Sequence, residues 1–91
     1  MVTAIILINA ERERIAAVGE QLADLPEITE VYSVAGQFDL VAMVRVKENE
    51  DLAALVTQKM PAIDGIASTQ TLIAFRAYSR HDLESLFSVG L

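Results

Sequence analysis

The residues best suited to hold a ligand lie in one short stretch of this 91-residue chain, Gly36-Gln37-Phe38-Asp39. A glycine, an aromatic side chain and a carboxylate stand there directly before an almost uncharged apolar run at residues 40–44. A loop rich in backbone N–H groups beside a carboxylate could hold a zwitterion, because the N–H groups would meet its carboxylate and Asp39 its ammonium. The same residues could also form a plain turn, in which Gly36 supplies a positive φ angle and Asp39 hydrogen-bonds the backbone of the turn. The residue types alone leave both interpretations open.

Patterns typical of catalytic and metal sites are missing from the sequence. The one histidine, His81, falls beyond the last expected strand, where we expect a surface side chain rather than a general base. The chain has no cysteine and no HxH or HExxH spacing, which excludes disulfides, thiolate sites and the common histidine metal motifs. Acids and bases alternate at residues 11–14, as in the solvated first turn of a helix, and the four glycines form no phosphate-binding loop. We therefore predict no catalytic residue, no metal, no cofactor and no enzyme.

The charge of the chain argues against direct contact with nucleic acid. Seven basic residues stand against thirteen acidic ones, for a formal net charge of −6, and the basic residues are scattered along the sequence. Binding to DNA usually needs a basic face whose charges displace the counterions of the phosphates. We predict that this chain does not bind DNA by itself.

The apolar content predicts an oligomer. Apolar residues make up 53% of the chain, and its mean hydropathy is +0.38. A domain of this size buries only a little over roughly 60% of its unfolded surface, so its own interior cannot hide so many apolar side chains. Subunit interfaces of obligate assemblies resemble domain cores and can take the surplus.

The first apolar run, residues 2–8, is too short to cross a bilayer and lacks the features of a signal peptide, so we expect a cytoplasmic protein.

Hydrophobic periodicity predicts the element order β-α-β-β-α-β. The expected elements are strands at residues 2–8, 30–35, 40–46 and 66–78, a helix capped by Asn9 and stopped by Pro26, and a helix capped by Asn49 and ended by Asp64-Gly65. A weak internal repeat supports this order, because LPEITEV at residues 25–31 aligns with MPAIDGI at residues 60–66. Two similar βαβ halves are typical of the α+β, ferredoxin-like fold, an antiparallel four-stranded sheet with both helices on one face. The first and third strands are apolar on both sides, so we predict two sheets packed face to face in a dimeric α+β barrel.

The chain divides into a domain at residues 1–78 and a C-terminal tail at residues 79–91. The tail opens with Ser79-Arg80-His81-Asp82, which resembles a capping box with Asp in place of Glu, and large apolar residues follow at helical spacing. A short amphipathic helix docked on a neighbour and a frayed end are both compatible with this pattern.

Three short motifs resemble those of a known family. They are Gly36-x-Phe38-Asp39-Leu40, the P-x-I-x-G-I turn at residues 61–66, and Thr69-x-Thr71 at the start of the last strand. Together they resemble the ligand-binding domain of the Lrp/AsnC (feast/famine) transcriptional regulators, also called the RAM domain. The resemblance extends over residues 2–78, nearly the whole chain.

The resemblance implies a fold, an assembly and a binding site. In that family the βαββαβ domain pairs through its sheets, dimers often form octameric rings of four dimers, and amino-acid effectors bind at the contacts between dimers. Carried onto this chain, the pocket residues are Gly36, Gln37, Phe38, Asp39, Thr69 and Thr71. Full-length regulators also carry an N-terminal helix-turn-helix domain, whereas the first strand here begins at Val2. We therefore expect a stand-alone RAM protein that takes part in transcriptional regulation of amino-acid metabolism and associates with full-length regulators.

Other functions use the same architecture. Dimeric α+β barrels include small monooxygenases and isomerases, but their barrel interior carries a His, Asp or Tyr, and the strand residues here are nearly all apolar. A purely structural assembly module stays open, because Gly36 and Asp39 serve a turn as well as a ligand. The ACT domain, a related amino-acid sensor usually fused to an enzyme, shares the topology and ranks below the RAM interpretation.

Overall fold

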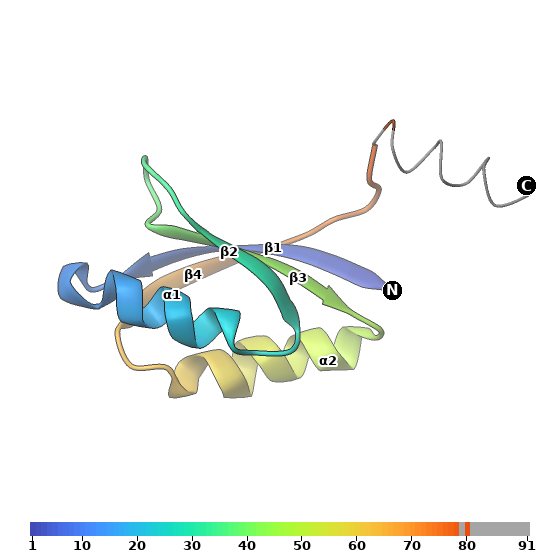
Figure 1. Cartoon of the computed structure of the whole chain (residues 1–91). Coiled ribbons are helices and arrows are strands. Elements are labelled where there is room, and N and C mark those ends of the chain that lie inside the picture. The colour runs from blue at the N-terminus through green and yellow to red at the C-terminus, as the bar shows by residue number, and fades with distance from the viewer. Residues whose placement is uncertain (79, 81–91) are drawn as a thin grey trace, which may run out of the picture.

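The fold is a single antiparallel sheet with its helices on one face (Figure 1). The computed structural model describes residues 1–78 and residue 80. The strands are β1 (Val2–Ala10), β2 (Ile28–Ser33), β3 (Leu40–Val46) and β4 (Ile66–Ile73). The helices are α1 (Ile15–Ala23), which follows a 3₁₀ turn η1 (Arg12–Arg14), and α2 (Asn49–Ala54), which continues through a π-helical turn η2 (Leu55–Lys59) and a 3₁₀ turn η3 (Met60–Ala62). This confirms the predicted ferredoxin-like α+β fold.

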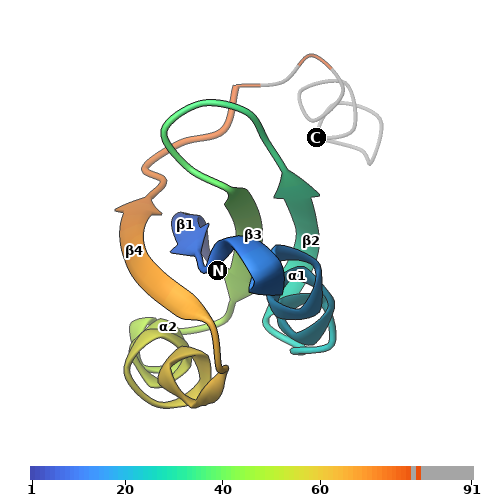
Figure 2. The same ribbon diagram turned by 90° about the vertical axis from the view of Figure 1, so that its left-hand side faces the viewer.

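The strand order across the sheet is β2-β3-β1-β4, so β1 and β3 are central and β2 and β4 are edges. Every neighbouring pair is antiparallel. Seen end-on, α1 lies on the side of β2 and α2 on the side of β4 (Figure 2). The two βαβ halves of the chain therefore each supply one central strand, one edge strand and one helix.

Both predicted helix caps are wrong. Asn9 belongs to β1, where it pairs with Ser68 of β4, and the chain passes through η1 before α1 begins. Asn49 is already the first residue of α2, and its N-cap is Glu48. The Glu48 N–H donates to the Asp51 carboxylate at 3.1 Å, which is the return half of a capping box. Pairing with Ser68 thus keeps Asn9 in a strand, and the Asp51 carboxylate makes Glu48 the N-cap of α2.

The bounds of three strands also differ from the prediction, and β1 extends to Ala10 rather than to residue 8. β2 covers Ile28–Ser33, two residues earlier than expected, since its ladder with β3 begins at Ile28 opposite Val44. β4 ends at Ile73 rather than at residue 78. Ile73 pairs with Ala4, and the Ala74 N–H donates to the Thr3 carbonyl at 2.9 Å, so β1, which begins at Val2, has no partner residue to offer as far as residue 78. The tail predicted at residues 79–91 lies outside the described residues, apart from residue 80.

The hydrophobic core lies between the sheet and the helices. Alternate residues of β1 and β3 point into it, and the largest side chains buried in full are Ile6, Ile8, Leu22, Leu55, Val18 and Val44. A strand with one face on a core shows this alternation. The core therefore accounts for only one side of each central strand.

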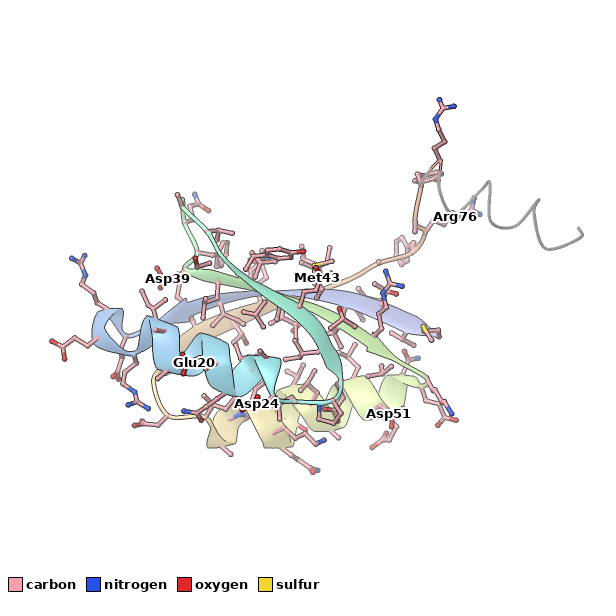
Figure 3. All side chains as sticks on the ribbon, viewed as in Figure 1. Glu20, Asp24, Asp39, Met43, Asp51 and Arg76 are labelled. Atoms are coloured by element: carbon pink, nitrogen blue, oxygen red, sulfur yellow. The ribbon has the colours of Figure 1, made fainter. Side chains whose placement is uncertain are left out.

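The opposite side of the sheet is apolar as well. Cross-strand partners on this side include Ile5 with Met43 and with Leu72, and Tyr32 with Val41. Leu72 is 42% exposed and Tyr32 is 48% exposed, and Met43 stands on the side of the sheet away from the helices (Figure 3). We call this surface the open sheet face, because no element within residues 1–78 covers it. Among the described residues, no helix is long and apolar enough to cross a membrane.

Candidate functional site

The loop at residues 34–39 joins β2 to β3 and stands out from one end of the sheet (Figure 1). The Val34 N–H donates to the Asp39 carbonyl at 3.0 Å and closes the loop. Gly36 has φ +124°, and an added Cβ would meet no atom within 4 Å. The glycine is therefore needed for its backbone conformation rather than for space, as the turn interpretation predicts.

Asp39 closes the loop only through its carbonyl, and its N–H and side chain bond to β1. Its N–H donates to the Ile8 carbonyl at 2.9 Å, and its Oδ2 accepts a hydrogen bond from the Ala10 N–H at 3.0 Å. β3 begins at Leu40 opposite Ile8, so Ala10 lies beyond the ladder and would otherwise have no strand partner on that side. The turn interpretation expected the Asp39 side chain to bond the backbone of its own turn, and this partner is wrong. The half-buried carboxylate instead accepts from Ala10, 29 residues away in the chain, where β3 offers no backbone acceptor.

The second oxygen of Asp39 has a different environment. Oδ1 accepts no hydrogen bond from the residues that the structure describes. Figure 3 shows Asp39 at the end of the sheet, near the base of the loop. Phe38 beside it is half-buried, whereas Gly36 and Gln37 are exposed. One oxygen thus holds the fold together, and the other can accept a hydrogen bond from a donor outside these residues.

The two threonines lie on another strand. Thr69 and Thr71 pair with Ile8 and Ile6 on β4, while Leu40 pairs with Ile8 from the other side. β3 and β4 are therefore separated by β1, which means about 10 Å at two strand spacings. The structure does not bring the loop and the threonines together within one chain.

The threonines instead border two hollows between β4 and the second helical segment. Thr69 lines a cavity of about 230 Å³ with Met60 and Ile63, and Thr71 lines one of about 340 Å³ with Leu52 and Val56. Neither cavity includes a residue of the loop at 34–39.

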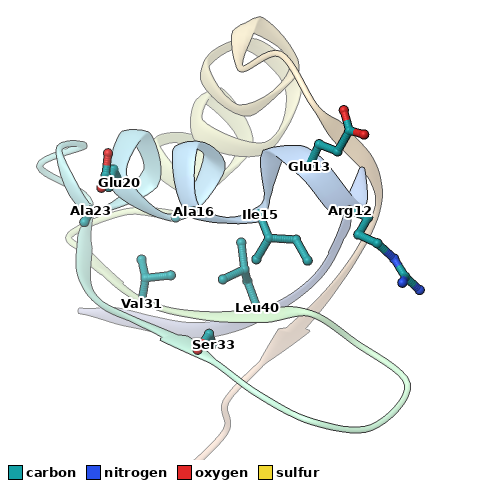
Figure 4. A pocket seen from close by; sticks show the side chains of 10 residues that line it. Arg12, Glu13, Ile15, Ala16, Glu20, Ala23, Val31, Ser33 and Leu40 are labelled. Carbon is teal, nitrogen blue, oxygen red and sulfur yellow. The ribbon is translucent and has the colours of Figure 1, made fainter.

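A third hollow, larger than these two, was not predicted from the sequence. It has a volume of about 640 Å³ and lies between α1 and β2 (Figure 4). Ala16, Gly19 and Ala23 of α1 form one wall, and the other lining residues are Arg12, Glu13, Ile15, Glu20, Val31, Ser33 and Leu40. We call it the α1 hollow. The small residues on one side of α1 were the available signal, but only the packing of α1 over β2 turns them into a cavity.

Two ion-pair or hydrogen-bond contacts shift a pKa outside the loop. Lys59 donates to Glu27 and lowers the pKa of that carboxyl below its ordinary value. Glu30 accepts a hydrogen bond from the Tyr32 hydroxyl and raises the pKa of that phenol. The described residues contain no group of three or more His, Cys, Asp or Glu that could hold a metal ion. Neither of the two contacts that shift a pKa involves a residue of the loop at 34–39.

Comparison with known proteins decides the family. The family model described as the Lrp/AsnC ligand binding domain matches residues 3–83. The chain belongs to this family. Its members are domains of transcriptional regulators and are not enzymes, so the monooxygenase and isomerase alternatives are excluded.

Individual relatives agree with this assignment of an Lrp/AsnC ligand-binding domain. An uncharacterized HTH-type transcriptional regulator of Pyrococcus abyssi is 39% identical over 72 residues, which are 79% of this chain and 46% of that protein. The structure of TTHA0845 from Thermus thermophilus is 50% identical with a TM-score of 0.83, over 88% of this chain and 100% of the other. AsnC of E. coli is 27% identical with a TM-score of 0.78, over 84% of this chain and 52% of the other. The chain thus spans about half the length of the curated relative and the whole of the Thermus protein.

Proposed function

We propose that this Lrp/AsnC domain binds an amino acid where two protomers meet, and that binding regulates its assembly with transcriptional regulators of amino-acid metabolism. The observation that carries the proposal is the state of Asp39, with one oxygen held by Ala10 and the other without a partner among the described residues. A half-buried carboxylate in a glycine-containing loop suits the ammonium group of an amino acid. The exposed loop residues Gly36 and Gln37 supply backbone N–H groups for its carboxylate.

The second half of the site comes from another copy. A single amino acid is too small to contact both Asp39 and Thr71 in one chain, since β1 separates their strands and Thr71 lies two residues further along β4 than Thr69. Thr69 and Thr71 are edge-strand residues that a neighbouring protomer can approach. We therefore place the loop of one protomer against the threonines of another.

The open sheet face supports a dimer. Its apolar side chains are partly exposed on a sheet whose other face already carries both helices. Monomeric soluble proteins rarely leave a continuous apolar surface of this kind uncovered. Two such faces packed together give a homodimer, and contacts between dimers through the loop and β4 build the octamer of four dimers that the family resemblance implies.

In this proposal the partner regulators, and not this domain, contact DNA. The net charge of −6 disfavours binding of this domain to a polyanion. The proposed partners are full-length Lrp/AsnC regulators, in the cytoplasm, whose domains of this type share its fold.

The experiment is a calorimetric and thermal-shift screen of amino acids, followed by titration of two variants. A regulator from Neisseria meningitidis with this fold was solved in complex with L-Met; it is 11% identical with a TM-score of 0.79, and we use it only to choose the first ligand. Asp39→Asn keeps an oxygen for the Ala10 N–H and removes the charge. We expect an unchanged midpoint without ligand and an affinity lower by about ten- to a hundred-fold, the cost of a charge-assisted hydrogen bond.

The control is Asp24→Asn, which changes an exposed carboxylate at the end of α1. It should bind like the wild type. Equal affinity of the wild type and Asp39→Asn would leave Asp39 with its structural role alone and favour the purely structural assembly module, which the Asp39–Ala10 hydrogen bond also supports.

A further inference from the structure

The segment that follows β4 exposes two aromatic side chains. Residues 74–78, which we call the arm, leave the sheet on the side away from the helices (Figures 1 and 2). Phe75 is 98% exposed and Tyr78 is 87% exposed. Aromatic side chains bury about 150–250 Å² each when they pack, so two of them in water within four residues mark a surface that a partner covers.

The α1 hollow has room for an aromatic side chain. Its small wall residues leave room, and a Cβ added at Gly19 would meet only Leu40 Cδ2, at 3.6 Å. Val31 and Leu40 give it an apolar floor, as Figure 4 shows. It also borders β2, an edge strand that pairs only with β3 among the described residues and therefore offers backbone groups to a further strand.

The arm of a chain does not reach its own hollow. The arm starts beside Ile73, which pairs with Ala4, whereas the hollow includes Leu40, which pairs with Ile8. Three strand spacings across the sheet and four residues along β1 separate the two positions by about 20 Å. Five extended residues span at most about 18 Å, and the arm leaves toward the face opposite α1.

We infer that the arm of one protomer packs into the α1 hollow of a second copy of this chain. Charge supports this occupant, because the arm carries Arg76, whereas the lining of the hollow carries two acids, Glu13 and Glu20, against one base, Arg12. In a two-fold dimer each copy gives one arm and receives one. This contact is separate from the proposed effector site, since it uses neither the loop at 34–39 nor Thr69 and Thr71.

Disulfide trapping tests the contact directly, because the chain has no cysteine of its own. Ala77→Cys on the arm is mixed with Ala23→Cys in the hollow under mild oxidation. We expect a covalent heterodimer in the Ala77→Cys plus Ala23→Cys mixture. The matched control pairs Ala77→Cys with Gln58→Cys, an exposed position on η2, and should give at most about a tenth of that yield.

A plug variant adds a second test. Ala16→Trp fills the hollow and should abolish the trapped heterodimer, whereas Gln21→Trp, exposed on α1 outside the hollow, should leave it unchanged. Arg76→Glu should lower the yield, and Glu20→Arg in the other partner should restore it.

The inference is overturned by three results. One is an equal yield with Gln58→Cys, and another is the absence of any Ala77–Ala23 product in a sample that sediments as a dimer. The third is trapping of the arm at Arg45→Cys on the open sheet face instead of at Ala23→Cys. Amino-acid titration of the Ala16→Trp variant separates this contact from the proposed function, because a lost heterodimer with intact effector binding affects the arm alone.

Discussion

The loop at residues 34–39 and the open sheet face are both exposed. They differ in that the loop makes hydrogen bonds to the rest of the fold, whereas the open sheet face presents apolar side chains to water. In the loop, Val34 and Asp39 close the turn, and Asp39 also holds Ala10 and Ile8 of β1. On the open sheet face, apolar side chains such as Leu72 meet no cover within residues 1–78. A polar loop can stay in water at little cost, whereas an apolar face gains free energy when it is buried. Changes in the loop should therefore act on local stability and ligand binding, and changes on the open sheet face on assembly.

The largest effect is expected from a charge on the open sheet face. Leu72→Lys places an ammonium among the side chains of Ile5 and Met43, which a dimer would bury. We expect the dimer dissociation constant to rise by more than about a hundred-fold, measured by sedimentation. The control is Gln58→Lys on η2, which adds the same charge on an exposed helical surface and should leave the dimer intact. A Leu72→Lys dimer as tight as the wild type would show that another surface joins the protomers.

A smaller effect is expected when the structural hydrogen bond of the loop is removed. Asp39→Ala leaves the half-buried Ala10 N–H without its acceptor, which should lower the free energy of unfolding by about 1–3 kcal/mol. Asp39→Asn keeps an oxygen at that place and should lose much less. Urea unfolding of both variants without ligand measures the difference. Equal losses in the two variants would mean that the charge, and not the hydrogen bond, joins the loop to β1.

The backbone of the loop gives the next effect. Gly36→Ala forces a side chain onto a residue with φ +124°, which should cost about 1–2 kcal/mol although the added methyl meets open space. Gly19→Ala is the matched control, because the same methyl enters α1 at an ordinary contact distance of 3.6 Å and should stabilise by about 0.5–1 kcal/mol. Unfolding curves with opposite shifts for the two glycines are the expected outcome. A neutral Gly36→Ala would show that the loop adopts other conformations in solution.

The smallest effect comes from an ion pair remote from both regions. Lys59 lowers the pKa of Glu27, so this carboxyl binds its proton less readily in the folded chain than in the unfolded one. Its contribution is present above the unfolded value of about 4.3 and is lost as the pH falls through the lower folded pKa. Because the pair is partly exposed, we expect less than about 1 kcal/mol, and Glu27→Gln should remove this part of the acid dependence of unfolding. An unchanged acid limb in Glu27→Gln would assign the dependence to other carboxylates.

The sequence predicted the architecture better than the boundaries and the contacts. Alternating and helical periodicity is local information, which is why the element order and the two apolar sides of β1 and β3 could be predicted. Asn9 was misplaced as a cap because its state depends on Ser68, 59 positions away in the chain. The partner of Asp39 could not be predicted for the same reason, since Ala10 reaches it only after β1 and β3 have paired.

The members of the candidate site were taken from the family resemblance and stay a prediction. The resemblance groups the loop with the threonines, but the strand order places β1 between Asp39 and Thr69 within one chain. The α1 hollow depends on the distance between a helix and an edge strand, which no residue spacing encodes.

The interleaved strand order has a consequence for how the chain folds. β1 pairs with β3 and β4, and β2 pairs with β3 alone, so each strand of the first βαβ half finds its partners in the second half. Neither half can form a hydrogen-bonded sheet by itself, and a cut between them would leave two fragments without ladders. Unfolding of the domain should therefore be a single cooperative transition with no half-folded species. Most of its strand contacts also join distant parts of the chain, which places it among the slower-folding small domains.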